Sequence, residues 1–204
     1  MTKGKAKPHH FLRISIRARQ DLRAWKYFLR NYNGVTLLAE ARWITSERLS
    51  LQTDAATTHG YAAVLGTKWF CGAWPETWVD KHISAMELYP ICAAVALWSL
   101  EIENACITFQ CDNEAVCHAI NNQSAKEDNL MALLRRLIIT TMTQNIMFRA
   151  VHVPGIDNHL ADALSRFQME KARARAPSLD QEPTTLPDHL HPEAILKETY
   201  WQQV

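Results

Sequence analysis

The sequence predicts an α/β fold in which a five-stranded mixed sheet carries helices on its faces. Three short segments with strand character follow one another between residues 49 and 74, which indicates an antiparallel meander. After residue 84, helical segments alternate with two further strands, which is the order of an α/β protein. The 204 residues, of which 48% are hydrophobic, suffice for one domain with a substantial core and flanking segments.

The N-terminal segment, residues 1–48, is strongly basic and carries one expected helix. It holds 11 Lys and Arg residues against 3 Asp and Glu residues. We expect Asp21 to cap the helix, because apolar residues follow it at helical spacing until Asn33-Gly34 ends the run. These apolar positions are Leu22, Trp25, Phe28 and Leu29. Residues 35–43 form either a short strand or a connector.

The first three strands of the expected sheet are separated by turn residues. The first begins at Leu49 and alternates apolar with polar residues as far as Asp54, so one of its faces is polar. The second and third cover residues 60–66 and 67–74, because Gly66 interrupts the run and Pro75 ends it. The short links between the strands favour antiparallel pairing.

Helices and strands alternate in the rest of the expected domain, which spans residues 49–167. In chain order the expected elements are a helix at 84–100, a strand at 106–112, a helix at 114–120, a helix capped by Asp128, a strand at 146–153 and a helix beginning near residue 157. The order of elements is therefore β-β-β-α-β-α-α-β-α. Residues 168–204 turn charged and then Pro-rich, so we expect a disordered tail there.

Composition and charge exclude several classes of protein. No run of 18 apolar residues occurs and no apolar stretch follows the first charged residues, so we expect no membrane partner and no secretory signal. The five cysteines lack Cys-x-x-Cys spacing, which predicts reduced, mostly buried thiols in an intracellular protein and argues against a zinc site. The net charge of +1 excludes a uniformly basic nucleic-acid binder.

Four acidic residues are candidates for catalytic chemistry: Asp54, Glu87, Asp112 and Asp162. Each also has a purely structural interpretation. Asp54 is placed to cap a turn, and Glu87 is placed to close a capping box with Ser84. Asp112 is placed to cap the helix that follows it, and Asp162 to be a solvated helix residue. For any one of them alone, the structural interpretation is the stronger.

Taken together, the four carboxylates indicate a metal site. If the strands that end at Asp54 and Asp112 are parallel neighbours, these carboxylates lie side by side and their repulsion requires a proton or a cation. Glu87, one turn into a helix on that face, would join them. Oxygen donors without a His or Cys set favour Mg²⁺ or Mn²⁺ over zinc, and such a cage can hold two ions. One ion would lower the pKa of an attacking water, and the other would stabilise the leaving oxygen of a phosphodiester.

At these residues the chain resembles the ribonuclease H family, in the form found in the reverse-transcriptase polyproteins of retroelements. The resemblance covers residues 49–167 and is most specific in the closing block, residues 152–166, which is most similar to that of tyrosine-recombinase (DIRS-like) retrotransposons. The other blocks are Thr53-Asp54-Ala55 with Gly60-Tyr61-Ala62-Ala63, Ala85-Met86-Glu87-Leu88 and Cys111-Asp112-Asn113-Glu114-Ala115-Val116. Residues 21–34 also resemble the connection region between polymerase and ribonuclease H.

The resemblance implies a ribonuclease H-like fold and endonucleolytic cleavage of the RNA strand of an RNA–DNA hybrid. The family's metal-binding acids fall on Asp54, Glu87, Asp112 and Asp162. Two Mg²⁺ ions, which Mn²⁺ could replace, are the implied cofactors. The hybrid is the implied partner, and a reverse-transcriptase polymerase domain is a further candidate. Because no Tyr-x-Asp-Asp polymerase signature occurs, we expect a fragment or a stand-alone derivative of a retroelement.

The chain departs from the family in two respects. Many cellular ribonucleases H carry a histidine in a flexible loop before the last acid, and neither His152 nor His159 clearly matches it. His159 is the better candidate for an accessory catalytic role, with a solvated helix residue as the alternative; we expect His152 to have a backbone partner. The basic substrate-binding protrusion of some cellular enzymes is also absent, so other residues must bind the substrate.

Short polar side chains are the candidates for contacts to phosphate and sugar: Thr57, Thr58, Asn113, Asn121, Asn122, Gln123 and Ser124. Arg135 and Arg136 lie off the apolar stripe of their helix and are either further phosphate contacts or a solvated basic face. The tryptophans Trp69, Trp74 and Trp78 are expected to pack in the core or against the sheet rather than stack on bases.

Two alternatives to an active ribonuclease H stay open. One is a catalytically silent ribonuclease H-like module, domesticated from a retroelement, that binds nucleic acid or protein. The other is a different nuclease or an integrase on the same fold. The four intact acids favour the active enzyme. Residues 49–167 hold 7 Lys and Arg against 12 Asp and Glu, an acidic surplus that bound metal ions would offset.

Overall fold

The structure, a computed structural model, describes residues 13–197 apart from 33, 35–42, 46 and 153–157. It is an α/β protein whose described strands form two three-stranded sheets. The antiparallel sheet has the order β2 (Leu51–Ala56), β3 (Gly60–Leu65), β4 (Lys68–Ala73), which confirms the predicted meander. In the parallel sheet, β5 (Cys106–Cys111) lies between β1 (Trp43–Thr45) and β6 (Met147–His152).

The α/β class is confirmed, whereas the described strands do not form the expected single five-stranded sheet. We expected β2 to pair with β5, but β1 is the strand that pairs with β5 on that side, with Thr45 opposite Thr108. A turn separates β1 from β2, because Leu49 N donates to Thr45 O at 3.1 Å and Ser50 adopts a left-handed φ of 53°. The chain therefore changes direction before β2 begins.

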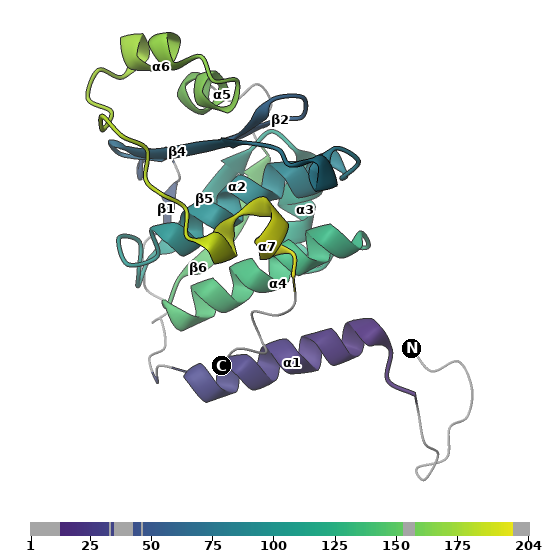
Figure 1. The fold of residues 1–204 in the computed structure, drawn as a ribbon. Helices are drawn as coiled ribbons and strands as arrows, with labels where there is room; N and C mark the ends of the chain where they lie inside the picture. The colour runs from purple at the N-terminus through teal and green to yellow at the C-terminus, as the bar shows by residue number, and fades with distance from the viewer. Residues whose placement is uncertain (1–12, 33, 35–42, 46, 153–157, 198–204) are drawn as a thin grey trace.

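Helices cover both faces of the antiparallel sheet (Figure 1). α2 (Ile83–Leu97) packs against one face, and α5 (His159–Ser165) packs against the other, with α6 (Met169–Arg175) beside it. The side chains of β3 alternate between the two faces, as a strand requires. Tyr61 and Ala63 belong to the main core on the α2 side, while Ala62 and Val64 belong to a second core that α5 and α6 complete.

The remaining helices extend the molecule beyond α2 (Figure 1). α4 (Asp128–Thr143) packs against α2, and α3 (Glu114–Asn122) lies against β6. α1 (Ile16–Asn31) forms an outer layer along α4. Two ion pairs join α1 to α4. Arg17 Nη2 of α1 lies 2.6 Å from Oδ1 of Asp128, the first residue of α4, and Asp21 Oδ1 of α1 lies 2.7 Å from Arg135 Nε of α4.

Two helices have caps other than the predicted ones. Ser15 caps α1 by accepting a hydrogen bond from Ala18 N at 3.2 Å, and the predicted cap Asp21 is instead used by Arg135. Glu127, rather than Asp128, caps α4 and accepts hydrogen bonds from the backbone N–H groups of the first turn. Several neighbouring polar residues could cap each of these helices. The two carboxylates predicted as caps, Asp21 and Asp128, instead form ion pairs with Arg135 and Arg17.

The prediction of a disordered tail is wrong for residues 168–197. α6 is followed by a chain that carries the 3₁₀ turn η2 (Asp188–Leu190) and the short helix α7 (Pro192–Ile195). The buried apolar side chains of this segment include Leu179, Leu186, Leu190 and Ile195. The sequence pattern does not reveal these buried residues, because they are widely spaced in a Pro-rich segment. They pack against residues that are far away in the sequence.

Two further predictions concern membrane-spanning helices and the state of the cysteines. Within the described parts of the chain, no helix combines the length and the apolar character that crossing a bilayer requires. The five cysteines are free thiols, of which four are buried and Cys71 is half-buried, as expected.

Candidate functional site

The four candidate carboxylates come from four different elements. Asp54 lies within β2, opposite Ala62 of β3. Glu87 lies in the second turn of α2, Asp112 directly follows β5, and Asp162 lies in α5. Both sheets and two helices therefore contribute to this set.

Three of the structural interpretations of these acids are wrong. α2 is capped by His82, whose Nδ1 accepts from Ser84 N at 3.2 Å, so Ser84 and Glu87 form no capping box. α3 is capped by Asn113, whose Oδ1 accepts from Val116 N at 3.2 Å, so Asp112 is not the cap. Asp54 pairs within a strand rather than capping a turn. None of these three carboxylates therefore caps a helix or a turn in its own part of the chain.

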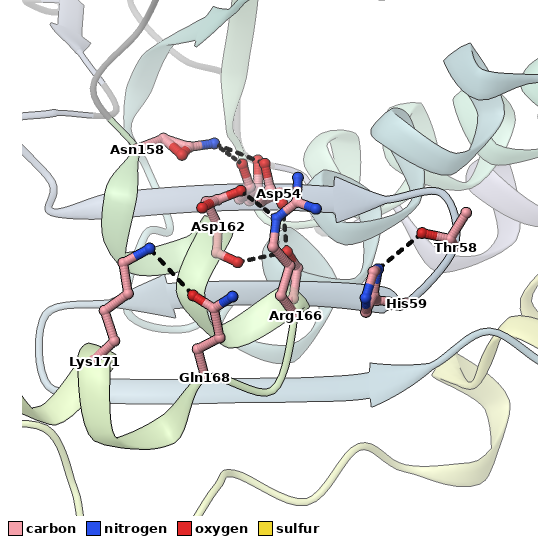
Figure 2. A network of polar contacts seen from close by, with 10 residues as sticks. Asp54, Thr58, His59, Asn158, Asp162, Arg166, Gln168 and Lys171 are labelled. Atoms are coloured by element: carbon pink, nitrogen blue, oxygen red, sulfur yellow. Dashed lines mark hydrogen bonds and ion pairs between the residues drawn. The ribbon is translucent and has the colours of Figure 1, made fainter.

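Two side chains at the two ends of α5 contact the carboxylate of Asp54: Asn158, just before the helix, and Ser165, its last residue (Figure 2). Ser165 Oγ is 2.5 Å from Asp54 Oδ2, and Asn158 Nδ2 donates to Asp54 Oδ1 at 3.2 Å and to Thr53 O at 3.0 Å. Burial raises the pKa of Asp54, and the charges of Asp162 and Asp112 raise it further, while the Ser165 hydrogen bond and Arg166 act in the opposite direction. Asp54 therefore interacts electrostatically with acids from α5 and from the end of β5.

The pKa of Glu87 is strongly raised above its ordinary value. Burial raises its pKa to about 8, and the negative charges of Asp54 and Asp112 contribute to the increase. Carboxylates from β2, α2 and the end of β5 thus share one electrostatic neighbourhood, and Asp162 joins it through Asp54. Uncompensated negative charge of this kind favours either a proton or a cation.

Asp162 is already paired with a cation. Arg166 Nε donates to Asp162 Oδ1 at 2.7 Å, one helical turn along the chain. The side chains of Asp162 and Arg166 are 34% and 42% exposed, so the pair borders on solvent. Asp162 is consequently not fully solvated, and one of its two carboxylate oxygens already has a cationic partner.

The donor chemistry suits a hard cation, although the ligand shell is not assembled. Four carboxylates supply only oxygen donors, which Mg²⁺ and Mn²⁺ prefer. Among the described residues, no three His, Cys, Asp or Glu side chains converge closely enough to hold an ion. The hydrogen bonds from Ser165 and Asn158 to Asp54, and the ion pair of Asp162, direct their oxygens to other partners.

The two histidines lie at different places. His152 Nε2 is 3.1 Å from the backbone oxygen of Asp112, which confirms the expected backbone partner. His159 is exposed as the first residue of α5, three residues before Asp162. The accessory catalytic role of His159 stays a prediction.

The predicted substrate-binding residues divide into two groups. Thr57, Thr58 and Asn113 lie beside the acids in the chain, and both threonines are exposed in the turn between β2 and β3. Asn121, Asn122, Gln123 and Ser124 lie at the other end of α3, which spans about 13 Å. Because α3 starts just after Asp112, the length of this helix separates these four residues from that carboxylate.

The second group has structural partners. Asn121 joins α3 to β6 by donating to Ala150 O and accepting from Ala150 N, both at 2.8 Å. Asn122 Nδ2 donates to His118 O at 2.9 Å. Gln123 and Ser124 line a pocket of about 410 Å³ between α1 and α4. Loop-like polar composition does not distinguish such structural roles from substrate contacts.

The basic and aromatic candidates are mostly buried. Arg135 and Arg136 are 8% and 5% exposed, so the solvated basic face is wrong, and burial also disfavours contacts to phosphate. The packing of α1 over α4, which the sequence pattern of α4 cannot reveal, covers Arg135. Trp69 and Trp78 are buried and Trp74 stacks on Trp78 with ring centroids 4.9 Å apart, which confirms their packing role.

Three residues of the site were missed by sequence reasoning, namely Asn158, Ser165 and Arg166. They flank Asp162 in the closing block, and Ser165 and Arg166 follow it by three and four residues. Helical spacing alone places these positions on the same side of a helix, and this was the available signal.

The raised pKa of Glu87 predicts a specific pH dependence of stability. A carboxyl group whose folded pKa is about 8, against an ordinary value of 4.5, favours the folded state when protonated, so stability falls as pH rises from about 4.5 to about 8. Without divalent cations, Glu87→Gln is therefore expected to stabilise the protein by about 2 kcal/mol at pH 8 and by much less near pH 5. Urea unfolding at both pH values, in a chelator, measures the difference.

Glu101→Gln is the matched control, because the hydrogen bond from Lys68 lowers the pKa of Glu101. Its effect should have the opposite sign, with a small loss of stability at pH 8. Equal stabilisation by Glu87→Gln at both pH values would contradict the raised pKa.

No model of a known protein family matches the chain, and a search of curated proteins finds no match.

Proposed function

We propose that the chain is a metal-dependent endonuclease that hydrolyses the RNA strand of RNA–DNA hybrids. The observation that carries the proposal is the electrostatic coupling of Asp54, Glu87, Asp112 and Asp162, which come from four separate elements. The closing block around Asp162 supports the same conclusion through its resemblance to retroelement ribonucleases H. A ribonuclease H-like fold is part of the proposal, and the electrostatic interaction of Asp54, from the antiparallel sheet, with Asp112, at the end of the parallel sheet, supports it.

The four carboxylates would hold two Mg²⁺ ions, for which Mn²⁺ can substitute. Bound there, the ions would supply a water of lowered pKa and a stabilised leaving oxygen. Ser165 and Asn158 orient the carboxylate of Asp54 through their hydrogen bonds. Thr57, Thr58 and Asn113, which lie beside the acids in the chain, are the leading candidates for contacts to the sugar and phosphate groups of the hybrid, and the polar residues at the end of α3 stay further candidates. Selectivity for the RNA strand would depend on its 2′-hydroxyl groups.

The basic N-terminal part of the chain offers the positive charge that the acidic domain lacks. Residues 1–48 carry 11 Lys and Arg residues against 3 Asp and Glu residues. We include in the proposal that this part supports hybrid binding or contact with a reverse-transcriptase polymerase domain, as its resemblance to a connection region suggests.

A second candidate function is a catalytically silent module that binds nucleic acid or protein. One observation favours it: Arg166 occupies Asp162, and no three metal-ligating side chains of the described residues converge. A silent module would keep affinity for hybrid while showing no metal-dependent cleavage.

Incubation of the full chain with an end-labelled RNA–DNA hybrid tests the proposed function. Double-stranded DNA of the same sequence is the matched substrate, and each reaction is run with Mg²⁺ and with a chelator. We expect internal cuts in the RNA strand of the hybrid only, and only with Mg²⁺. Binding without cutting would establish the silent module, and cutting of double-stranded DNA would indicate a different nuclease on this fold.

A further inference from the structure

Arg166 introduces a fixed positive charge into the acidic site. It directly follows α5, and its Nε donates to Asp162 Oδ1 at 2.7 Å (Figure 2). Its positive charge also interacts with Asp54. One guanidinium group thus serves as counter-ion to two of the four carboxylates.

This guanidinium and a divalent cation require the same carboxylate. A cation held by Asp162 needs an oxygen of that carboxylate and the removal of nearby positive charge, since two cations at one carboxylate repel each other. With Asp162 paired to Arg166, the described residues contain no converged set of three metal-ligating side chains.

We propose that Arg166 competes with the divalent cation for Asp162, so that cation binding requires the guanidinium to leave this carboxylate. The inference rests on the metal site of the proposed function. Both partners are partly exposed, so Arg166 can move into solvent without leaving a buried, unpaired charge. Arg166 is accordingly a positioning residue: it acts through Asp162 and holds this acid when no cation is bound.

A merely structural ion pair makes a different prediction. Asp and Arg four residues apart stabilise a helix by a small amount, and loss of that contribution would weaken α5 and the placement of Asp162. Cation affinity would then stay equal or fall when Arg166 is replaced. Competition predicts the reverse, because removal of the competitor leaves Asp162 available.

Calorimetric titration with Mn²⁺ alone distinguishes these two roles. The proteins are the unmodified chain, Arg166→Gln, Arg166→Lys and the control Lys171→Gln. Lys171 is exposed on α6, and its Nζ donates to Gln168 Oε1 at 3.1 Å. We expect Arg166→Gln to bind Mn²⁺ about 2- to 5-fold more tightly, which corresponds to the loss of one partly exposed ion pair. Arg166→Lys, which keeps the charge, should return toward the unmodified chain, and Lys171→Gln should match it.

Thermal unfolding gives a second measurement that does not depend on activity. Mn²⁺ should raise the melting temperature of Arg166→Gln by more than that of the unmodified chain. Equal or weaker Mn²⁺ binding by Arg166→Gln, with an unchanged circular dichroism spectrum, would overturn the role of Arg166. Absence of Mn²⁺ binding in all four proteins would overturn the metal site together with it. Tighter binding without hybrid cleavage would leave the role of Arg166 standing and overturn only the proposed function.

Discussion

Removal of residues 177–204 is expected to abolish cooperative folding. This segment contributes four buried Leu and Ile side chains: Leu179, Leu186, Leu190 and Ile195. At about 2 kcal/mol for each buried aliphatic side chain, their loss is similar to the whole stability of a typical domain. Circular dichroism during urea unfolding should therefore show no sigmoidal transition in the shortened chain.

Hydrogen bonds to this segment increase the expected effect. Trp78 Nε1 donates to Pro192 O at 2.9 Å, and Tyr89 OH donates to Leu190 O at 3.0 Å. Trp78 and Tyr89 are both buried in the main core, so truncation leaves buried donors without partners or opens the core to water. Residues 180 and 184 also donate backbone hydrogen bonds to residues 67 and 69 and so cover the edge of β4.

Two point variants test the same conclusion when the shortened chain cannot be purified. Leu190 is 1% exposed, and Leu190→Ala is expected to cost about 2–5 kcal/mol. Thr185 is exposed in the same segment, and Thr185→Ala should change stability by less than about 0.5 kcal/mol. A shortened chain with the full stability of the intact protein would contradict the packing of this segment.

Local patterns in the sequence predict most elements of the fold. The period-two alternation from Leu49 to Asp54 predicts the strand that the structure places at 51–56 as β2, and the leucines of α4 form its buried face. These predictions succeed because each depends on a few consecutive residues. The sheet arrangement depends instead on contacts between distant segments, such as the three residues of β1 that pair with β5.

The predictions that failed also depend on contacts between segments that are distant in the sequence. Arg135 is exposed by the pattern of its own helix and is covered only because α1 packs over α4 and supplies Asp21. Leu190 lies in a Pro-rich segment, and its burial depends on α2. In the candidate site, the acids were visible as residue types, whereas Asn158 and Ser165 required knowledge of which side chain faces Asp54.

Asp112→Asn is expected to have the largest effect on activity. Asp112 directly follows β5, is electrostatically coupled to Asp54 and Glu87, and is a proposed ligand of the metal ions. The amide keeps the size of the carboxylate but removes its negative charge, so the fold should persist while cation binding weakens. We expect hybrid cleavage to fall at least about a thousandfold, which equals about 4 kcal/mol of transition-state stabilisation.

Glu170→Gln is the matched control, because it also removes one negative charge but lies exposed on α6. Its cleavage rate should equal that of the unmodified chain. If both variants lost activity to the same extent, a general effect of net charge on substrate binding would explain the loss, and Asp112 would have no special role.

Whether the coupled carboxylates form a nuclease site is tested most directly by one measurement: the single-turnover rate of RNA-strand cleavage in an RNA–DNA hybrid with Mg²⁺. The unmodified chain, Asp112→Asn and Glu170→Gln are compared side by side. We predict rapid cleavage by the unmodified chain and by Glu170→Gln, and cleavage at least about a thousandfold slower by Asp112→Asn. No cleavage by the unmodified chain, or equal cleavage by Asp112→Asn, would contradict the proposed function.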